Sequence, residues 1–89
     1  MKAVITVLGR DRVGIIAAVS AACAENEVNI LDISQTILQG YFNMIMLVEI
    51  PESGIAIPAL AEKLDAVGAR LGVQIRVQHE AIFTAMHRV

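Results

Sequence analysis

The sequence predicts an α+β fold in which a four-stranded antiparallel sheet carries two helices on one face. Three observations predict it. Strand-like stretches and stretches of helical periodicity follow one another in the order strand, helix, strand, strand, helix, strand. The two middle strands are separated by only a tight turn, which makes them antiparallel neighbours. The length of 89 residues suits one two-layer unit. This order is the split arrangement called ferredoxin-like, and we expect a single domain over residues 1–89.

The first strand is expected over Lys2–Leu8, because this run is almost continuously apolar, as in a strand inside a sheet. The first helix is expected from Arg12 or Val13 to Glu25 or Asn26. Apolar residues at helical spacing give it one face for the sheet, namely Ile15, Ile16, Val19, Ala22 and Cys23.

The loop between this strand and this helix is the natural place for a small ligand. Gly9 is expected to form a turn that other residues would strain, and Asp11 is suited to cap the helix. Gly14 has no side chain that would hold a partner away from the backbone. A small anion bound here would meet unpaired N–H groups and the positive end of the helix dipole.

A hairpin of two long strands follows, expected over Val28–Leu38 and Tyr41–Ile50. Gly40 supplies the positive φ of a tight turn, and Pro51 ends the second strand because it has no N–H to donate. Right-handed crossovers then place the first and third strands at the centre of the sheet and both helices on one face. The other face is left bare. That face or an edge strand therefore offers a surface for a second copy.

The second helix is expected to begin near Pro58 and to end at Gly72, a residue that suits a C-terminal cap. The last strand alternates apolar and polar residues, which is typical of a sheet with one packed and one wetter face. The tail from Ala81 to Val89 is spaced for a short helical turn over an open edge. The helix buries Leu60, Leu64, Val67 and Leu71, and the strand buries Val73, Ile75 and Val77 opposite Gln74, Arg76 and Gln78.

The composition narrows the class of protein. Hydrophobic residues make up 56% of the chain, more than one small two-layer unit hides easily, which favours a homodimer. The net charge of −2, with three aromatic residues and no basic run, argues against nucleic-acid binding. No segment has the form of a signal peptide or the length of a membrane span, so we expect a cytoplasmic protein with no membrane partner. Cys23 is the single cysteine and is expected to be buried.

Similarity to a known family is carried by the segment Gly9-Arg10-Asp11-Arg12-Val13-Gly14-Ile15-Ile16 and by Asn29-Ile30 at the start of a strand. Together they resemble the ACT regulatory domain. More closely, Val4 to Val19 is similar to the ACT modules of the glycine cleavage system repressor and of formyltetrahydrofolate deformylase, which carry a Gly-x-Asp-Arg-Pro-Gly-Ile-type segment here. The likeness covers nearly the whole chain. The length and the ending also resemble small stand-alone ACT-domain proteins of bacteria and archaea, a group known by fold better than by activity.

This resemblance implies a dimeric sensor. ACT domains commonly pair side by side into an eight-stranded sheet and bind a small amino acid at the seam. In the serine-sensing form, polar side chains of the first loop and an Asn opening the second strand hold the ligand, and these positions correspond to Asp11 and Asn29. This chain has Gly9 where that form has a His, which removes one contact to serine. It also has Val13 where relatives have Pro, which leaves the loop less rigid.

The chemistry of such a ligand agrees with these residues. An amino acid zwitterion needs an acceptor for its ammonium and N–H donors for its carboxylate. Asp11 offers the first, while the amides at the helix start and the Asn29 side chain offer the second. Each has a structural alternative: Asp11 as a helix cap alone, Asn29 as a turn residue, and Arg12 as a solvated side chain or a partner for a carboxylate of another subunit. The candidate ligand-binding residues are Asp11, Arg12, Val13, Gly14, Ile15 and Asn29.

No catalytic, metal or cofactor site is expected. Neither a nucleophile beside a histidine nor a spaced carboxylate pair is present, and His79, Glu80 and His87 lack the compact spacing of a metal site. The glycines at 9 and 14 do not form a phosphate-binding or dinucleotide-binding pattern. We therefore expect a regulatory sensor and no enzyme, with a second copy, a small amino acid or related metabolite, and a regulated enzyme or regulator as partners. The alternative is a dimerisation or adaptor module without a ligand.

Overall fold

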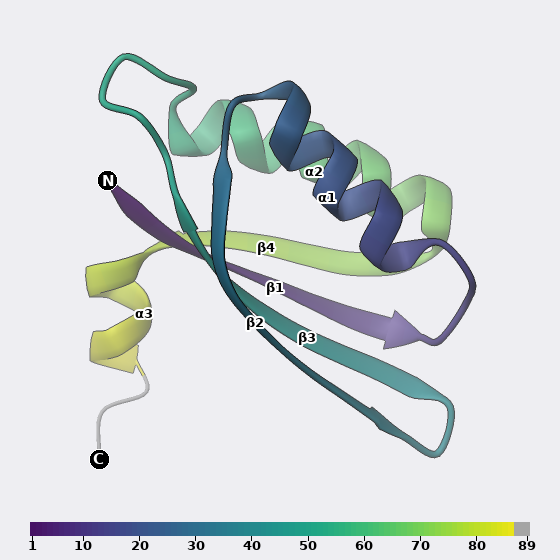
Figure 1. Cartoon of the computed structure of the whole chain (residues 1–89). Coiled ribbons are helices and arrows are strands. Elements are labelled where there is room, and N and C mark those ends of the chain that lie inside the picture. The colour runs from purple at the N-terminus through teal and green to yellow at the C-terminus, as the bar shows by residue number, and fades with distance from the viewer. Residues whose placement is uncertain (87–89) are drawn as a thin grey trace.

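The structure is a computed structural model that describes residues 1–86 (Figure 1). The strands lie in the order β2-β3-β1-β4, and every neighbouring pair is antiparallel. β1 and β3 are therefore central, and the predicted ferredoxin-like fold is confirmed. The elements are β1 Lys2–Arg10, α1 Ile15–Glu25, β2 Asn29–Leu38, β3 Tyr41–Glu49, α2 Ile57–Leu71, β4 Val73–His79 and α3 Glu80–Met86.

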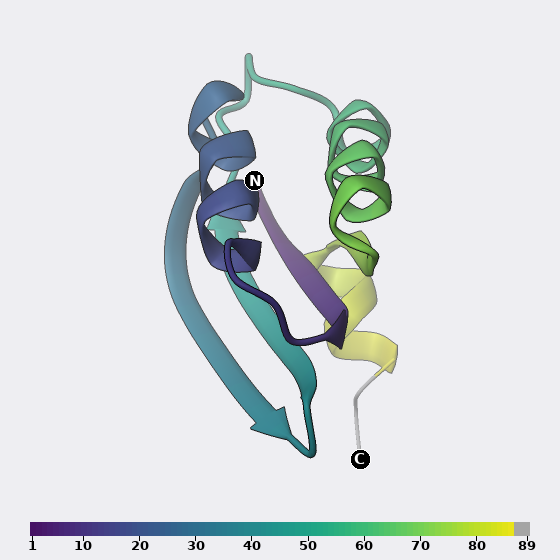
Figure 2. The ribbon, with the colours of Figure 1, turned by 90° about the vertical axis from the view of Figure 1, so that its right-hand side faces the viewer.

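The helices α1 and α2 lie side by side over one face of the sheet (Figure 2). The core lies between these two layers, because alternate residues of the central strands point towards the helices. The helices contribute their predicted apolar faces. Fully or almost fully buried in this core are Ala3, Ile5 and Val7 of β1, Phe42, Met44, Met46 and Val48 of β3, and Ile15, Val19, Cys23, Leu60 and Leu64 of the helices.

Two boundaries at the first loop differ from the prediction. β1 continues beyond Leu8, because Gly9 and Arg10 still pair with β3. Gly9 therefore does not form a turn. A Cβ atom at this position would lie 2.7 Å from Cγ1 of Val73, so glycine is required by the close approach of β4. α1 begins only at Ile15, since Gly14 has a φ of 96°, which a right-handed helix does not contain.

The predicted turn and cap of the later elements are confirmed. Gln39 and Gly40 have φ values of 52° and 81°, the positive signs that a two-residue hairpin turn requires. Pro58 lies in the first turn of α2, and Gly72 caps the helix with a φ of 74°. Pro58 suits the first turn because its missing N–H is not needed there, and Gly72 suits the cap because few other residues adopt a positive φ without strain.

A β-bulge at Leu31, between Ile30 and Asp32, was not predicted. After it, Asp32 pairs with Leu47 and Ser34 pairs with Ile45, on the face of the sheet away from α1 and α2. Both polar side chains are exposed. Their polarity therefore needs no buried partner, and they lie on the solvent side of the sheet.

The sheet face opposite α1 and α2 stays largely open, and α3 lies on this side, beside the start of β1 and the end of β4 (Figure 1). Val4 lies on this face, outside the main core. It is nevertheless only 5% exposed, because α3 contacts β1. The predicted helical turn in the tail is confirmed as far as Met86, and residues 87–89 lie outside the described part of the chain. Within residues 1–86, no helix combines the length and the apolarity of a membrane span.

Candidate functional site

The loop between β1 and α1 is held in place by its two neighbours. The backbone N–H of Asp11 donates to the carbonyl of Gly40 at 2.8 Å, which ties the loop to the hairpin turn. The Arg12 guanidinium donates from Nη1 to the carbonyl of Leu71 at 3.2 Å, which ties it to the end of α2. One donor of the exposed Arg12 guanidinium therefore has a partner within the chain. The loop has one defined position between these elements.

A hollow of about 240 Å³ opens between this loop, the start of α1 and the end of β2. It gathers four of the six predicted ligand-binding residues, namely Asp11, Arg12, Gly14 and Ile15. Val13 is not part of the lining and is 97% exposed. The lining is completed by Ile16, Ala17, Gln35, Ile37 and Phe42.

The start of α1 carries no side-chain cap from the described residues. Gly14 occupies the N-cap position, and the first turn contains no acidic residue. The interpretation of Asp11 as the helix cap is therefore wrong, because the chain enters the helix through the positive φ of Gly14, three residues later. The Asp11 carboxylate is exposed and has no hydrogen bond or ion pair within residues 1–86. Both an acceptor for a cation and unpaired helix amides are thus present beside the hollow.

Asn29 does not join these residues within one chain. It is exposed at the start of β2, where it pairs with Glu49. Ile37, which lines the hollow, follows eight residues later on the same strand, roughly 27 Å away at the rise of an extended strand. A small ligand cannot touch both ends of this strand in a single copy.

Five residues of the lining were missed from the sequence: Ile16 and Ala17 of α1, and Gln35, Ile37 and Phe42 of the hairpin. Ile37 pairs with Phe42 and Gln35 with Met44, and both partners face the helices. The Gln39-Gly40 turn fixes this pairing register. Side chains of β3 alternate between the two faces of the sheet, and the turn fixes which residue of β2 lies opposite each of them. This alternation is therefore the sequence signal that places Gln35 and Ile37 on the side of the helices.

The edge strand β2 leaves apolar surface uncovered next to the hollow. All residues of positions 31–40 are exposed. On the side facing α1, Ile33 is 40% and Ile37 is 54% exposed, and Ile16 of α1 is exposed beside them. An edge strand with such side chains is a template for pairing with another chain.

The histidine and cysteine chemistry considered from the sequence lies elsewhere. Nδ1 of His79 accepts a hydrogen bond from the Ala81 N–H at 3.1 Å, at the start of α3. Cys23 is buried in the core, and this burial raises the pKa of its thiol. His87 lies outside the described residues. Residues 1–86 contain no group of three side chains suited to hold a metal ion.

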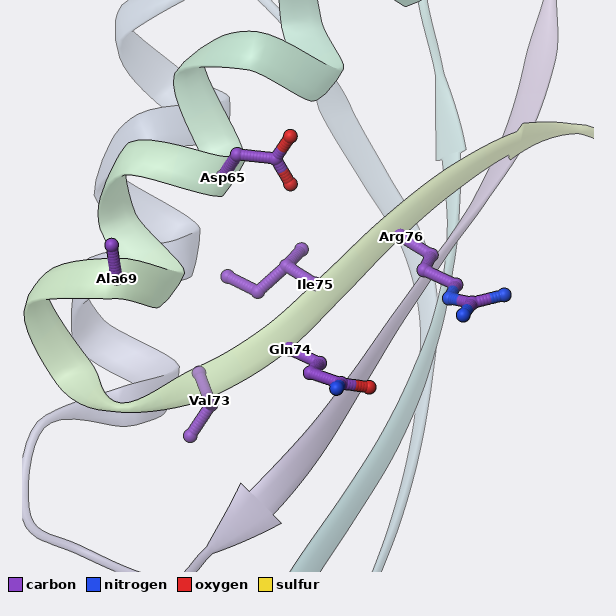
Figure 3. A pocket seen from close by; sticks show the side chains of 6 residues that line it. All are labelled: Asp65, Ala69, Val73, Gln74, Ile75 and Arg76. Atoms are coloured by element: carbon purple, nitrogen blue, oxygen red, sulfur yellow. The ribbon is translucent and has the colours of Figure 1, made fainter.

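A second hollow of about 430 Å³ lies between α2 and β4. Figure 3 shows the Asp65 carboxylate at its rim and Ile75 on its floor, while Gln74 and Arg76 point to the other face of the sheet. It contains none of the predicted ligand-binding residues. The loop hollow is therefore the better candidate for a ligand site.

The order of the elements and the position of the loop correspond to a known family. The family model of the ACT domain matches residues 2–78. The chain belongs to the ACT domain family. It is similar to a UPF0237 protein of Clostridium acetobutylicum, with 54% identity over 89 residues and full coverage of both chains. A solved ACT domain protein from Streptococcus pneumoniae is 44% identical, with a TM-score of 0.82 and 93% of each chain covered.

The resemblance to two larger proteins is confirmed at the level of the fold. A solved glycine cleavage system transcriptional repressor has 17% identity and a TM-score of 0.77, over 86% of this chain and 45% of that one. A formyltetrahydrofolate deformylase from Pseudomonas syringae has 21% identity and a TM-score of 0.79, over 88% of this chain and 27% of that one. Membership of the ACT family supports a regulatory role for the chain.

Proposed function

We propose that this protein is a cytoplasmic sensor that binds a small amino acid between two copies of itself and passes its occupancy to a regulated enzyme or regulator. One observation carries the proposal: the loop hollow lies directly beside an exposed apolar strand edge. Asp11 supplies the acceptor for the ligand's ammonium. The amides at the start of α1 supply donors for its carboxylate.

Pairing through β2 completes this site. Two copies related by a two-fold axis join their β2 strands in antiparallel orientation. The start of one strand then lies beside the end of the other. The backbone of Asn29 of the partner subunit comes next to Ile37, although the two ends of β2 are far apart in one chain. Because Asn29 pairs with Glu49 on the open face, its amide reaches the hollow around the strand edge. The exposed side chains of Ile33 and Ile37 are covered in the same step.

A ligand held by both copies must strengthen their association, since binding and assembly are thermodynamically linked. This linkage gives the proposal a direct test. The protein is heated with each of the twenty amino acids in turn, and its melting temperature is recorded. We expect at least one amino acid to raise it in the wild type and to raise it much less in Asp11→Ala and Asn29→Ala.

Asp65→Ala is the matched control, because Asp65 is an exposed acid beside the other hollow. It should leave the ligand-induced shift unchanged. If no amino acid changes the melting temperature while the dimer persists, the protein is a dimerisation or adaptor module without a ligand. An equal shift in Asp11→Ala and the wild type would show that the ligand binds outside the loop.

A further inference from the structure

A small hollow lies on the open face of the sheet, on the side away from α1 and α2. Its volume is about 220 Å³, and its lining comes from three neighbouring strands, β4, β1 and β3. Val4, which α3 covers, precedes the lining residues on the same face of β1, so the hollow lies beyond α3. We call it the open-face hollow, and its lining residues are Thr6, Leu8, Asn43, Gln74 and Arg76.

The strand register brings these five side chains together. Thr6 pairs with Arg76. Two residues later on β1, Leu8 lies between Gln74 of β4 and Asn43 of β3. Directly opposed side chains of antiparallel strands have Cβ atoms about 5 Å apart, and residues two apart on a strand share a face. Figure 3 shows the β4 side chains of the hollow extending from the strand on the side away from α2.

Four of the five lining side chains are polar, and their hydrogen-bonding groups are unused. None of them has a hydrogen bond or an ion pair with another residue of positions 1–86. The Arg76 guanidinium carries five N–H donors, the amides of Asn43 and Gln74 both donate and accept, and so does the Thr6 hydroxyl. Leu8, which is 52% exposed, supplies an apolar wall. The open-face hollow therefore combines unpaired donors with one apolar contact, as small-molecule sites do.

The charge of the open-face hollow favours an anion. Arg76 is its one charged lining residue, and Arg10 lies farther along the same face of β1. The acids on this side of the sheet do not line it, namely Asp32 on the opposite outer strand, Glu49 at the far end of β3 and Glu80 at the start of α3. A negative ligand group placed beside Arg76 therefore meets no acid in the lining.

We propose that the open-face hollow binds a small carboxylate that has no ammonium group, such as a hydroxy or oxo acid. The carboxylate accepts from the Arg76 guanidinium, whose parallel N–H groups match its two oxygens. The second oxygen function of the ligand binds to the side chains of Thr6, Asn43 and Gln74, and its short carbon chain contacts Leu8. An ammonium group would lie beside the guanidinium without an acid to accept from it, so an amino acid is rejected.

This site is separate from the loop hollow and independent of the function proposed for it. Phe42 lines the loop hollow and Asn43 lines the open-face hollow, and successive residues of a strand point to opposite faces of the sheet. The loop hollow contains Asp11, an acceptor for an ammonium, whereas the open-face hollow contains no acid. The two hollows therefore select different ligands, a zwitterion on one face and a simple carboxylate on the other.

The expected affinity is low, because the site is open to solvent. Asn43, Gln74 and Arg76 are exposed, and water and salt compete for the guanidinium. We therefore expect dissociation constants in the millimolar range. Such affinities suit a metabolite that is abundant in the cell.

An NMR titration of the isotope-labelled protein tests the site. Sodium lactate, sodium pyruvate and L-alanine are each added up to about 50 mM at constant ionic strength, with sodium chloride as the blank. L-alanine is the matched probe, because it differs from lactate in carrying an ammonium in place of the hydroxyl. We expect lactate or pyruvate to shift the backbone amide signals of the five lining residues in a saturable way, and L-alanine to leave them unchanged.

Two variants of the hollow and one control complete the test. Arg76→Gln should weaken carboxylate binding by about tenfold, because it removes the charge and keeps an amide. Asn43→Asp should abolish it, since it places an acid of the same size in the hollow. Arg70→Gln is the matched control, because Arg70 is exposed in the last turn of α2, away from this face, and its loss changes the net charge equally. It should bind as the wild type does.

The same spectra separate this proposal from the amino acid site. Signals of Asp11 and Gly14 report on the loop hollow, so their response to L-alanine bears on the function proposed above and leaves the open-face hollow untouched. The open-face site is overturned if neither lactate nor pyruvate gives a saturable shift at its lining residues. It is equally overturned if Arg76→Gln binds as Arg70→Gln does, or if L-alanine shifts the same signals as lactate.

Discussion

The guanidinium of Arg12 caps the last turn of α2 by donating to the carbonyl of Leu71 at 3.2 Å. Leu71 is the final residue of α2, and a positive charge at a helix C-terminus is favourable because it meets the negative end of the helix dipole. One residue of the candidate ligand loop therefore has a structural partner 59 positions away. Through this bond, the position of the loop depends on the corner between α2 and β4.

Replacing Arg12 with alanine should lower the free energy of unfolding by about 0.5–1 kcal/mol, since the bond is charge-assisted but exposed to solvent. Arg12→Lys should recover part of this loss, because it keeps the charge at the helix end. Urea unfolding of the three proteins measures the difference. Equal stability of Arg12→Ala and the wild type would show that the bond contributes nothing in solution.

Gly9→Ala should be destabilising by about 1–3 kcal/mol, because the added methyl group would lie 2.7 Å from Cγ1 and 3.0 Å from Cα of Val73. Val73→Ala removes the nearer atom, so the two changes together should cost less than the sum of the single changes. Thermal or urea unfolding of the full double-mutant cycle measures this coupling. Simple additivity would contradict the close approach of β1 and β4.

The contrast between Gly9 and Gly40 shows what the sequence can and cannot predict. Gly40 and Gly72 were placed correctly because a hairpin turn and a helix end are local structures with local residue requirements. The requirement at Gly9 arises from Val73, a neighbour brought close only by the completed sheet. The residues next to Gly9 along the chain therefore predict a turn that the structure does not contain.

The predictions for the candidate site differ in the same way, between local features and features that depend on the folded structure. Asp11, Arg12, Gly14 and Ile15 are close in sequence and line one hollow, and their role in ligand binding stays a prediction. The capping role of Asp11 was wrong because it depended on the φ of Gly14, which composition does not reveal. The bulge at Leu31 depends on the pairing of β2 with β3, so no local pattern indicated it.

Acid should weaken the fold in part through Glu49. The Met1 ammonium donates to the Glu49 carboxylate at 2.8 Å and lowers its pKa below the ordinary value of 4.5, with a smaller contribution from the charge of Lys2. A carboxyl with a lowered folded-state pKa adds stability above its unfolded pKa and loses it as the pH falls through the folded value. Glu49→Gln should therefore melt slightly below the wild type at neutral pH. The two melting temperatures should converge as the pH falls well below 4.5; a constant difference would exclude this carboxylate as the cause.

A mixing experiment decides whether Asp11 and Asn29 serve one site from two copies. Asp11→Ala and Asn29→Ala are unfolded together in equal amounts and refolded, and the mixture is titrated with the amino acid that shifts the wild type most. A site shared across the β2 seam is intact once in every mixed dimer, because one copy supplies Asp11 and the other Asn29. Random pairing then restores about a quarter of the wild-type binding capacity.

The control mixes Asp11→Ala with the double variant Asp11→Ala/Asn29→Ala, in which no pairing yields both side chains. It should stay without binding, whereas the first mixture recovers it. A site built within one copy predicts no recovery in either mixture, because every copy then carries its own defect. Asp11 and Asn29 of one copy lie near opposite ends of β2, which are roughly 27 Å apart, so a site within one copy cannot use both side chains. Recovery in the first mixture alone therefore requires that the two strands run antiparallel across the seam.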